Sequence, residues 1–140
     1  MANNYTQFSV IVPFPENMAL YDMWASKRVK DETETEDDAE YDNDEGRVDW
    51  RRDSAGLWVV SEEGGSVEAA AYLIQAYLCA TKQSIVVFMS WANTCSKPRV
   101  NEFDGGGVVI TQTEMFWVNA YDAINKATEA GVDTSTIVGA

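Results

Sequence analysis

The chain has 140 residues, of which 46% are apolar, and this is enough to build one domain with its own hydrophobic core. It carries 23 acidic and 10 basic residues, no histidine, and a formal net charge of −13. This charge disfavours direct binding to nucleic acid or to an anionic membrane surface, because phosphate groups repel it. The absence of histidine removes most acid–base and nucleophilic mechanisms, together with the commonest zinc ligand.

Two further features bear on the compartment in which the protein works. The two cysteines, Cys79 and Cys95, are too few for a disulfide framework, and we expect both to be reduced thiols. The N-terminal region has no basic segment, and Pro13 interrupts its apolar run, so we expect no signal peptide. No apolar stretch reaches the roughly 18 residues that a membrane span needs. The sequence therefore predicts a cytoplasmic protein.

The hydrophobic pattern predicts strands and helices that alternate along the chain. In chain order they are a strand at 7–14, a helix at 17–29, a hairpin at 47–60, a helix at 62–82, strands at 84–92, 107–112 and 115–118, and a helix at 120–130. Asn17 and, after the break at Gly64 and Gly65, Ser66 are expected to cap the first two helices, because their side chains can accept hydrogen bonds from unpaired helical N–H groups.

The order of these elements predicts the fold class. The first six elements follow the βαββαβ order of ferredoxin-like folds. We expect an α+β fold in which a mainly antiparallel sheet has helices on one face, with an extra hairpin and a C-terminal helix added. Residues 1–140 then form a single domain, with an acidic inserted loop at 31–45 and a loosely held tail at 132–140.

The negative charge is concentrated in residues 31–45, which read DETETEDDAEYDNDE and contain ten acids and no base. The remainder of the chain has 13 acids against 10 bases and is nearly neutral. Every even position from 32 to 44 is acidic: Glu32, Glu34, Glu36, Asp38, Glu40, Asp42 and Asp44. An extended chain would place these seven carboxylates on one side, roughly 6.6 Å apart, which is about twice the axial rise per phosphate along one DNA strand.

Three interpretations of this segment remain open. Acidic runs are commonly solvated linkers. A second interpretation is a surface that binds a basic protein. A third is a metal site, but the segment fails the EF-hand pattern, since Gly46 at the sixth position places Tyr41 first and Arg52 twelfth. We assign no metal and no cofactor to the chain.

A second region rich in reactive side chains is 91–107, which reads WANTCSKPRVNEFDGGG and is expected to be a long loop. Its candidate residues are Trp91, Cys95, Lys97, Arg99, Glu102 and Asp104. A nucleophilic Cys95 would need a base, and the chain has no histidine to act as one. The three glycines precede a strand instead of a helix, so they do not form a phosphate loop. We expect structural roles here, with the Lys–Pro–Arg sequence available for a carboxylate or for the acidic segment.

This region also carries a family resemblance. FMSWANTCSKPRVNEFDGGGVVIT, with the upstream GLWVVSEEGGSVEAAAYLIQAYL, resembles a pattern in small phage and prophage proteins of unknown function, over roughly residues 47–120. The resemblance implies a phage-encoded accessory protein that acts inside a bacterial host cell. Small acidic phage proteins include inhibitors of host defence, among them anti-CRISPR and antirestriction proteins that mimic DNA.

Three functional hypotheses follow. In the first, the protein is a non-enzymatic inhibitor whose acidic segment enters the basic nucleic-acid channel of a host defence protein. In the second, it is a structural or oligomeric accessory protein that associates through an exposed strand edge, at 7–14 or 107–112, and its acidic run is only a linker. In the third, it is an enzyme built around Cys95. We favour the first and assign no catalytic residue.

Overall fold

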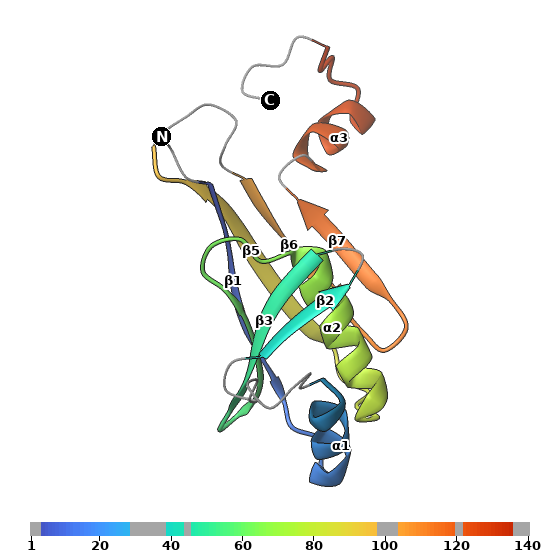
Figure 1. The fold of residues 1–140 in the computed structure, drawn as a ribbon. Helices are drawn as coiled ribbons and strands as arrows, with labels where there is room; N and C mark the ends of the chain where they lie inside the picture. Colours follow the sequence, from blue (N-terminus) through green and yellow to red (C-terminus); the bar gives the residue numbers. More distant parts are fainter. Residues whose placement is uncertain (1–3, 29–38, 44–45, 98–103, 120–121, 136–140) are drawn as a thin grey trace.

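The computed structural model describes residues 4–28, 39–43, 46–97, 104–119 and 122–135. It contains seven strands and three helices in the order shown in Figure 1. They are β1 (Asn4–Pro13), α1 (Met18–Arg28), β2 (Ala39–Asn43), β3 (Gly46–Asp53), β4 (Gly56–Ser61), α2 (Val67–Ala80), β5 (Val87–Cys95), β6 (Asp104–Ile110), β7 (Met115–Asn119) and α3 (Asp122–Glu129).

The strands form one sheet in the order β2-β3-β4-β1-β5-β6-β7, and each neighbouring pair is antiparallel. β4 lies between β1 and β3, which α1 and β2 separate in the chain, and β1 lies between β4 and β5, the two strands that α2 connects. These interleaved connections are those of a ferredoxin-like sheet. The predicted α+β class is therefore confirmed, with β6 and β7 as the extra hairpin, and the structure adds one strand, β2, that the predicted element order lacks.

One strand was not expected. The acidic composition predicts a loop over 31–45, whereas in the structure residues 39–43 form β2, the edge strand beside β3. Acidic residues are depleted in strands generally, and the pairing with β3 is the contact that holds residues 39–43 extended. The loop interpretation therefore fails for these five residues.

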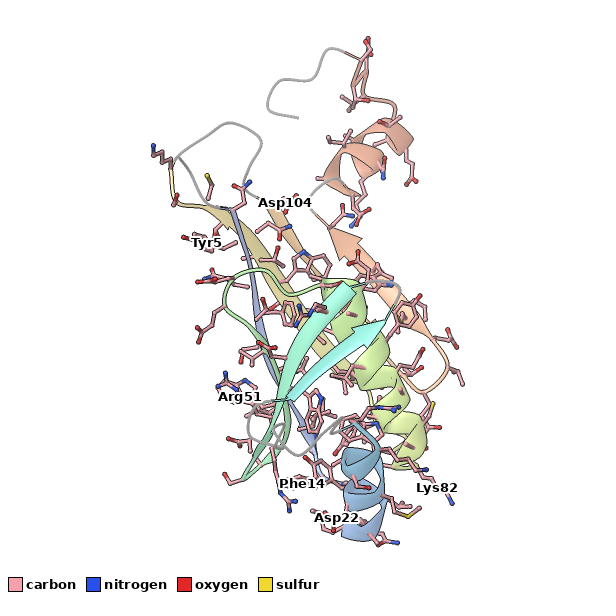
Figure 2. All side chains as sticks on the ribbon, viewed as in Figure 1. Tyr5, Phe14, Asp22, Arg51, Lys82 and Asp104 are labelled. Carbon is pink, nitrogen blue, oxygen red and sulfur yellow. The ribbon has the colours of Figure 1, made fainter. Side chains whose placement is uncertain are left out.

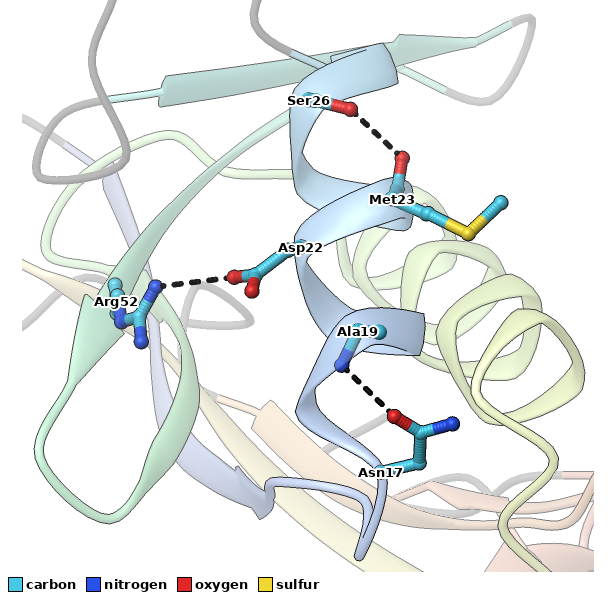
Figure 3. Close-up of polar contacts among 6 residues, drawn as sticks. All are labelled: Asn17, Ala19, Asp22, Met23, Ser26 and Arg52. Atoms are coloured by element: carbon cyan, nitrogen blue, oxygen red, sulfur yellow. Dashed lines mark hydrogen bonds and ion pairs between the residues drawn. The ribbon is translucent and has the colours of Figure 1, made fainter.

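The two N-terminal helices cover one face of the sheet, while α3 lies beyond the end of β7 (Figure 1). On α2, the Ser66 hydroxyl accepts a hydrogen bond from the N–H of Ala69 at 3.1 Å, as its predicted capping role requires. On α1, the side chain of Asn17 accepts from Ala19 at 3.1 Å (Figure 3). Both expected caps are confirmed.

Aromatic side chains from both helices and the sheet form the centre of the core. The ring of Trp24 on α1 lies 5.0 Å from the ring of Trp50 on β3 and 5.0 Å from that of Tyr77 on α2. At the margin of the core, Arg52 lies 5.1 Å from the Tyr21 ring and forms a 3.5 Å ion pair with Asp22 (Figure 3). α1 is thus held by ring packing inside and by one arginine outside.

The hydroxyl of Tyr77 gives the core a dependence on alkaline pH. It donates a 2.9 Å hydrogen bond to the carbonyl of Pro13, and burial raises its pKa well above the ordinary value of 10. The neutral phenol is favoured by folding, so its contribution is complete below pH 10 and declines as the unfolded chain ionises above that pH.

We therefore expect the free energy of unfolding to fall with rising pH above pH 10, and to fall less in Tyr77→Phe. At neutral pH the same variant loses about 1 kcal/mol with its hydrogen bond. Urea titrations between pH 7 and pH 11 measure both effects. If the free energy of unfolding fell equally steeply with pH in the original chain and in Tyr77→Phe, the pH dependence would not come from Tyr77.

Candidate functional site

The acidic segment reaches the described part of the structure in β2. Positions 40 and 42 lie on this strand, opposite Asp49 and Arg47 of β3. Glu32, Glu34, Glu36, Asp38 and Asp44, the other predicted partner-binding residues, lie outside the described residues. Asp49 and Arg47 are exposed, whereas their neighbours Val48 and Trp50 are buried under the helices. Positions 40 and 42 are therefore paired with exposed positions of β3.

The region predicted as a long loop at 91–107 consists largely of strand. Trp91 and Cys95 lie on β5, Asp104 begins β6, and the glycines at 105–107 lie within β6. Lys97 is exposed just after β5, and the predicted residues Arg99 and Glu102 lie outside the described residues. The loop interpretation is therefore wrong for most of this region.

The glycine-rich strand is stabilised by aromatic rings from its neighbours. A Cβ built at Gly106 would lie 2.8 Å from the Trp91 ring, and one at Gly107 would lie 2.7 Å from the Phe88 ring. Trp91 also packs against Trp117 of β7, with ring centroids 5.8 Å apart. The rings occupy the space that side chains on β6 would fill, so glycine is compatible with a strand at these positions.

The face of the sheet turned away from α1 and α2, called here the open face, is partly apolar. Three of its side chains are strongly exposed: Phe88 at 62%, Phe116 at 56% and Val118 at 55%. With Val109 and the glycines of β6 they line a shallow apolar cavity of about 500 Å³. The continuous apolar run at 84–92 predicts a fully buried strand, but β5 alternates between the core and this exposed face.

The other half of the open face is polar. A cavity of about 560 Å³ is lined by charged groups that include Arg47, Asp49, Arg51, Glu62 and Glu63. On this half, Arg51 lies 5.2 Å from the ring of Trp58, and the Trp58 indole donates a 2.8 Å hydrogen bond to the hydroxyl of Ser9. The open face therefore changes from charged at β3 to apolar at β7.

The candidate chemical groups have structural partners. The amide of Asn93 donates to the carboxylate of Asp104 across β5 and β6, at the end of the sheet labelled in Figure 2. Cys79 donates to the carbonyl of Gln112 at 3.2 Å, and neither cysteine forms a disulfide. In the described ranges, no group of three or more potential metal ligands comes together.

No protein-family model, no curated protein and no solved structure matches this chain. None of the helices in the described residues is both long enough and apolar enough to cross a membrane. The fold and the surfaces above are therefore the observations on which a function is argued.

Proposed function

We propose that the protein is a non-enzymatic inhibitor that binds a basic, nucleic-acid-binding defence protein of a bacterial host through residues 31–45. The observation that carries this proposal is β2, which holds residues 39–43 of the segment extended at the edge of the sheet. An extended edge strand repeats its side chains at intervals of roughly 6.7 Å and is accessible to a partner along its outer side.

Electrostatics supports a basic partner. The segment contributes ten acids without a base, while the rest of the chain is nearly neutral. A channel that binds phosphates presents lysine and arginine, and carboxylates can replace phosphates as acceptors of their charged hydrogen bonds. Binding then resembles nucleic-acid binding in weakening steeply as salt is raised. The cytoplasm of the host cell is the proposed site of action, and the gene is proposed to be carried by a phage.

The proposal is tested by neutralising the five central acids of the segment, as Glu34→Gln, Glu36→Gln, Asp38→Asn, Glu40→Gln and Asp42→Asn together. Because five charge-assisted contacts are lost, we expect the affinity for the partner to fall roughly 100-fold or more. The partner is captured from a bacterial lysate on the intact chain, identified by mass spectrometry, and titrated by calorimetry at low and high salt. Duplex DNA should displace it.

A control variant carries the same change in charge at five exposed acids elsewhere, Glu16, Glu62, Glu63, Glu114 and Glu129, each changed to Gln. It should retain nearly full affinity for the captured partner. If the affinity for the partner fell equally in the two variants, the segment would contribute only its net charge to binding. Unchanged affinity in both variants would contradict the proposed function.

The alternative, a structural or oligomeric accessory protein, rests on different edges from those the sequence indicates. The strand predicted at 7–14 is β1, in the middle of the sheet, and the strand predicted at 107–112 corresponds to β6, which pairs on both sides. The edge strands among the described residues are β2 and β7. Of these two edges, β7 is the one whose side chains are described, and it exposes apolar side chains. The partner of β7 is considered next.

A further inference from the structure

The outer side of β7 has main-chain groups directed away from the sheet. In the turn before it, the N–H of Thr111 donates to the carbonyl of Glu114 at 2.9 Å. Hydrogen-bonded pairs alternate along an antiparallel ladder, so Phe116 and Val118 direct their main-chain groups toward β6. Met115 and Trp117 direct theirs outward, to the side where a further strand would pair.

At the end of β7, the side chain of Asp122 occupies one of the outward main-chain donors. The N–H of Asn119, which also points outward, donates to the carboxylate of Asp122 at 2.5 Å. The accessible donors are therefore those of Met115 and Trp117, with Trp117 at the centre of the five-residue strand. A partner strand is expected to centre on the same residue.

Charge favours a second copy of the chain at this edge over association at other surfaces. Two molecules with a net charge of −13 repel each other, most strongly where residues 31–45 approach. β5 and β7 contain no charged residue, and β6 contains only Asp104. β7 lies at the opposite edge of the sheet from β2, which holds residues 39–43 of the acidic segment. It is the edge at which two copies meet with least repulsion.

The sequence of β7 is complementary to itself in one register. If two β7 strands pair antiparallel about a two-fold axis at Trp117, Phe116 of each copy lies opposite Val118 of the other. An aromatic ring beside a β-branched side chain is a favourable cross-strand pair, and it occurs twice. Both pairs lie on the open face, where these side chains are more than half exposed in one chain.

We propose that the protein forms a symmetric dimer in which β7 pairs with β7 of a second copy, centred on Trp117, to give one continuous antiparallel sheet. The interface is isologous, because the same residues contribute from both sides. It buries a short strand and a few large side chains, less than the roughly 800 Å² per partner of a standard interface. The association is therefore expected to be weak, with a dissociation constant on the order of 10 µM.

Sedimentation velocity on the intact chain, at concentrations from about 5 to 500 µM, tests the dimer. We expect the mass to rise from the 15.5 kDa of one chain toward twice that value. Val118→Lys places a charge in each cross-strand pair and should weaken association at least tenfold, a device that natural edge strands use against pairing. Val86→Lys is the matched control, since Val86 is 70% exposed and lies outside β7.

Hydrogen exchange provides a second readout that does not depend on a variant. The amides of Met115 and Trp117 should become protected as concentration rises, while those of Phe116 and Val118 stay protected throughout. A chain that remains monomeric at the highest concentration would overturn the proposal. So would a dimer that Val118→Lys and Val86→Lys affect equally.

The proposed dimer and the proposed inhibitor function can be contradicted independently of each other. The five-acid variant of residues 31–45 should still dimerise, because none of its substitutions lies in β7 and positions 40 and 42 lie on β2, at the opposite edge. The Val118→Lys monomer should still bind the captured partner through its acidic segment. Loss of dimerisation in the five-acid variant would contradict the β7 interface without bearing on the partner.

Discussion

Trp50→Ala should remove about 3 to 5 kcal/mol from the free energy of unfolding, the cost typical of truncating a large core side chain. Trp50 is fully buried and packs against Trp24 at 5.0 Å. It lies opposite Val59 on β4, so its ring joins α1 to the centre of the sheet. Loss of the ring leaves a cavity that the rigid sheet cannot close. Guanidinium titration followed by circular dichroism measures the effect.

Trp58→Ala is the matched control, because Trp58 is half-buried on the open face and should cost only about 1 kcal/mol. Trp50→Phe is a second comparison. No acceptor for the buried Trp50 indole N–H is found among the described residues, so phenylalanine keeps part of the packing and removes that donor. Equal losses for Trp50→Ala and Trp58→Ala would mean that the core is not centred on Trp50.

Gly106→Ala should separate β7 from the sheet, at a cost of about 3 kcal/mol. A Cβ at this position would lie 2.1 Å from the carbonyl oxygen of Val118 and 2.9 Å from the Cα of Asn119. Both are main-chain atoms of the paired strand, so they can move away only if pairing is broken. The Trp91 ring, 2.8 Å from the same Cβ, would also be displaced.

Hydrogen exchange should show the change as lost protection at Phe116 and Val118, with β1 and β4 unaffected. Sedimentation should show that the proposed dimer is lost as well. Gly64→Ala is the control, since a Cβ there has no heavy atom within 4 Å. If Gly106→Ala retained protection along β7, the close approach of β6 and β7 would be wrong.

Much of the fold is encoded in local patterns of the sequence. Ser66 and the apolar face that follows it predict α2, and the order of strands and helices predicts the interleaved sheet. β2 could not be predicted, because ten acids in fifteen residues dominate every local signal and the strand is stabilised only by pairing with β3. Amino-acid composition indicates the conformation that a segment favours in isolation. Whether the segment becomes an edge strand depends on the strand it pairs with, which here is β3.

The surfaces were harder to predict than the fold. Three consecutive glycines favour a loop, whereas β6 pairs with β5 and β7 and has the rings of Trp91 and Phe88 beside Gly106 and Gly107, which are contacts that the local sequence does not show. In the apolar run around Phe88, hydrophobicity alone does not distinguish the buried side from the exposed side. Edge position is also not local, since it depends on the order of all seven strands.

The central place of β1 has a consequence for how the chain folds during synthesis. β1 leaves the ribosome before both of its neighbours in the sheet, since its Phe8 pairs with Ser61 on one side and with Trp91 on the other. The apolar side chains of β1 therefore remain without their final packing partners until those later segments have been synthesised. Such distant contacts slow folding to milliseconds or longer, and the pairing of β1 on both sides is delayed until β5 has emerged.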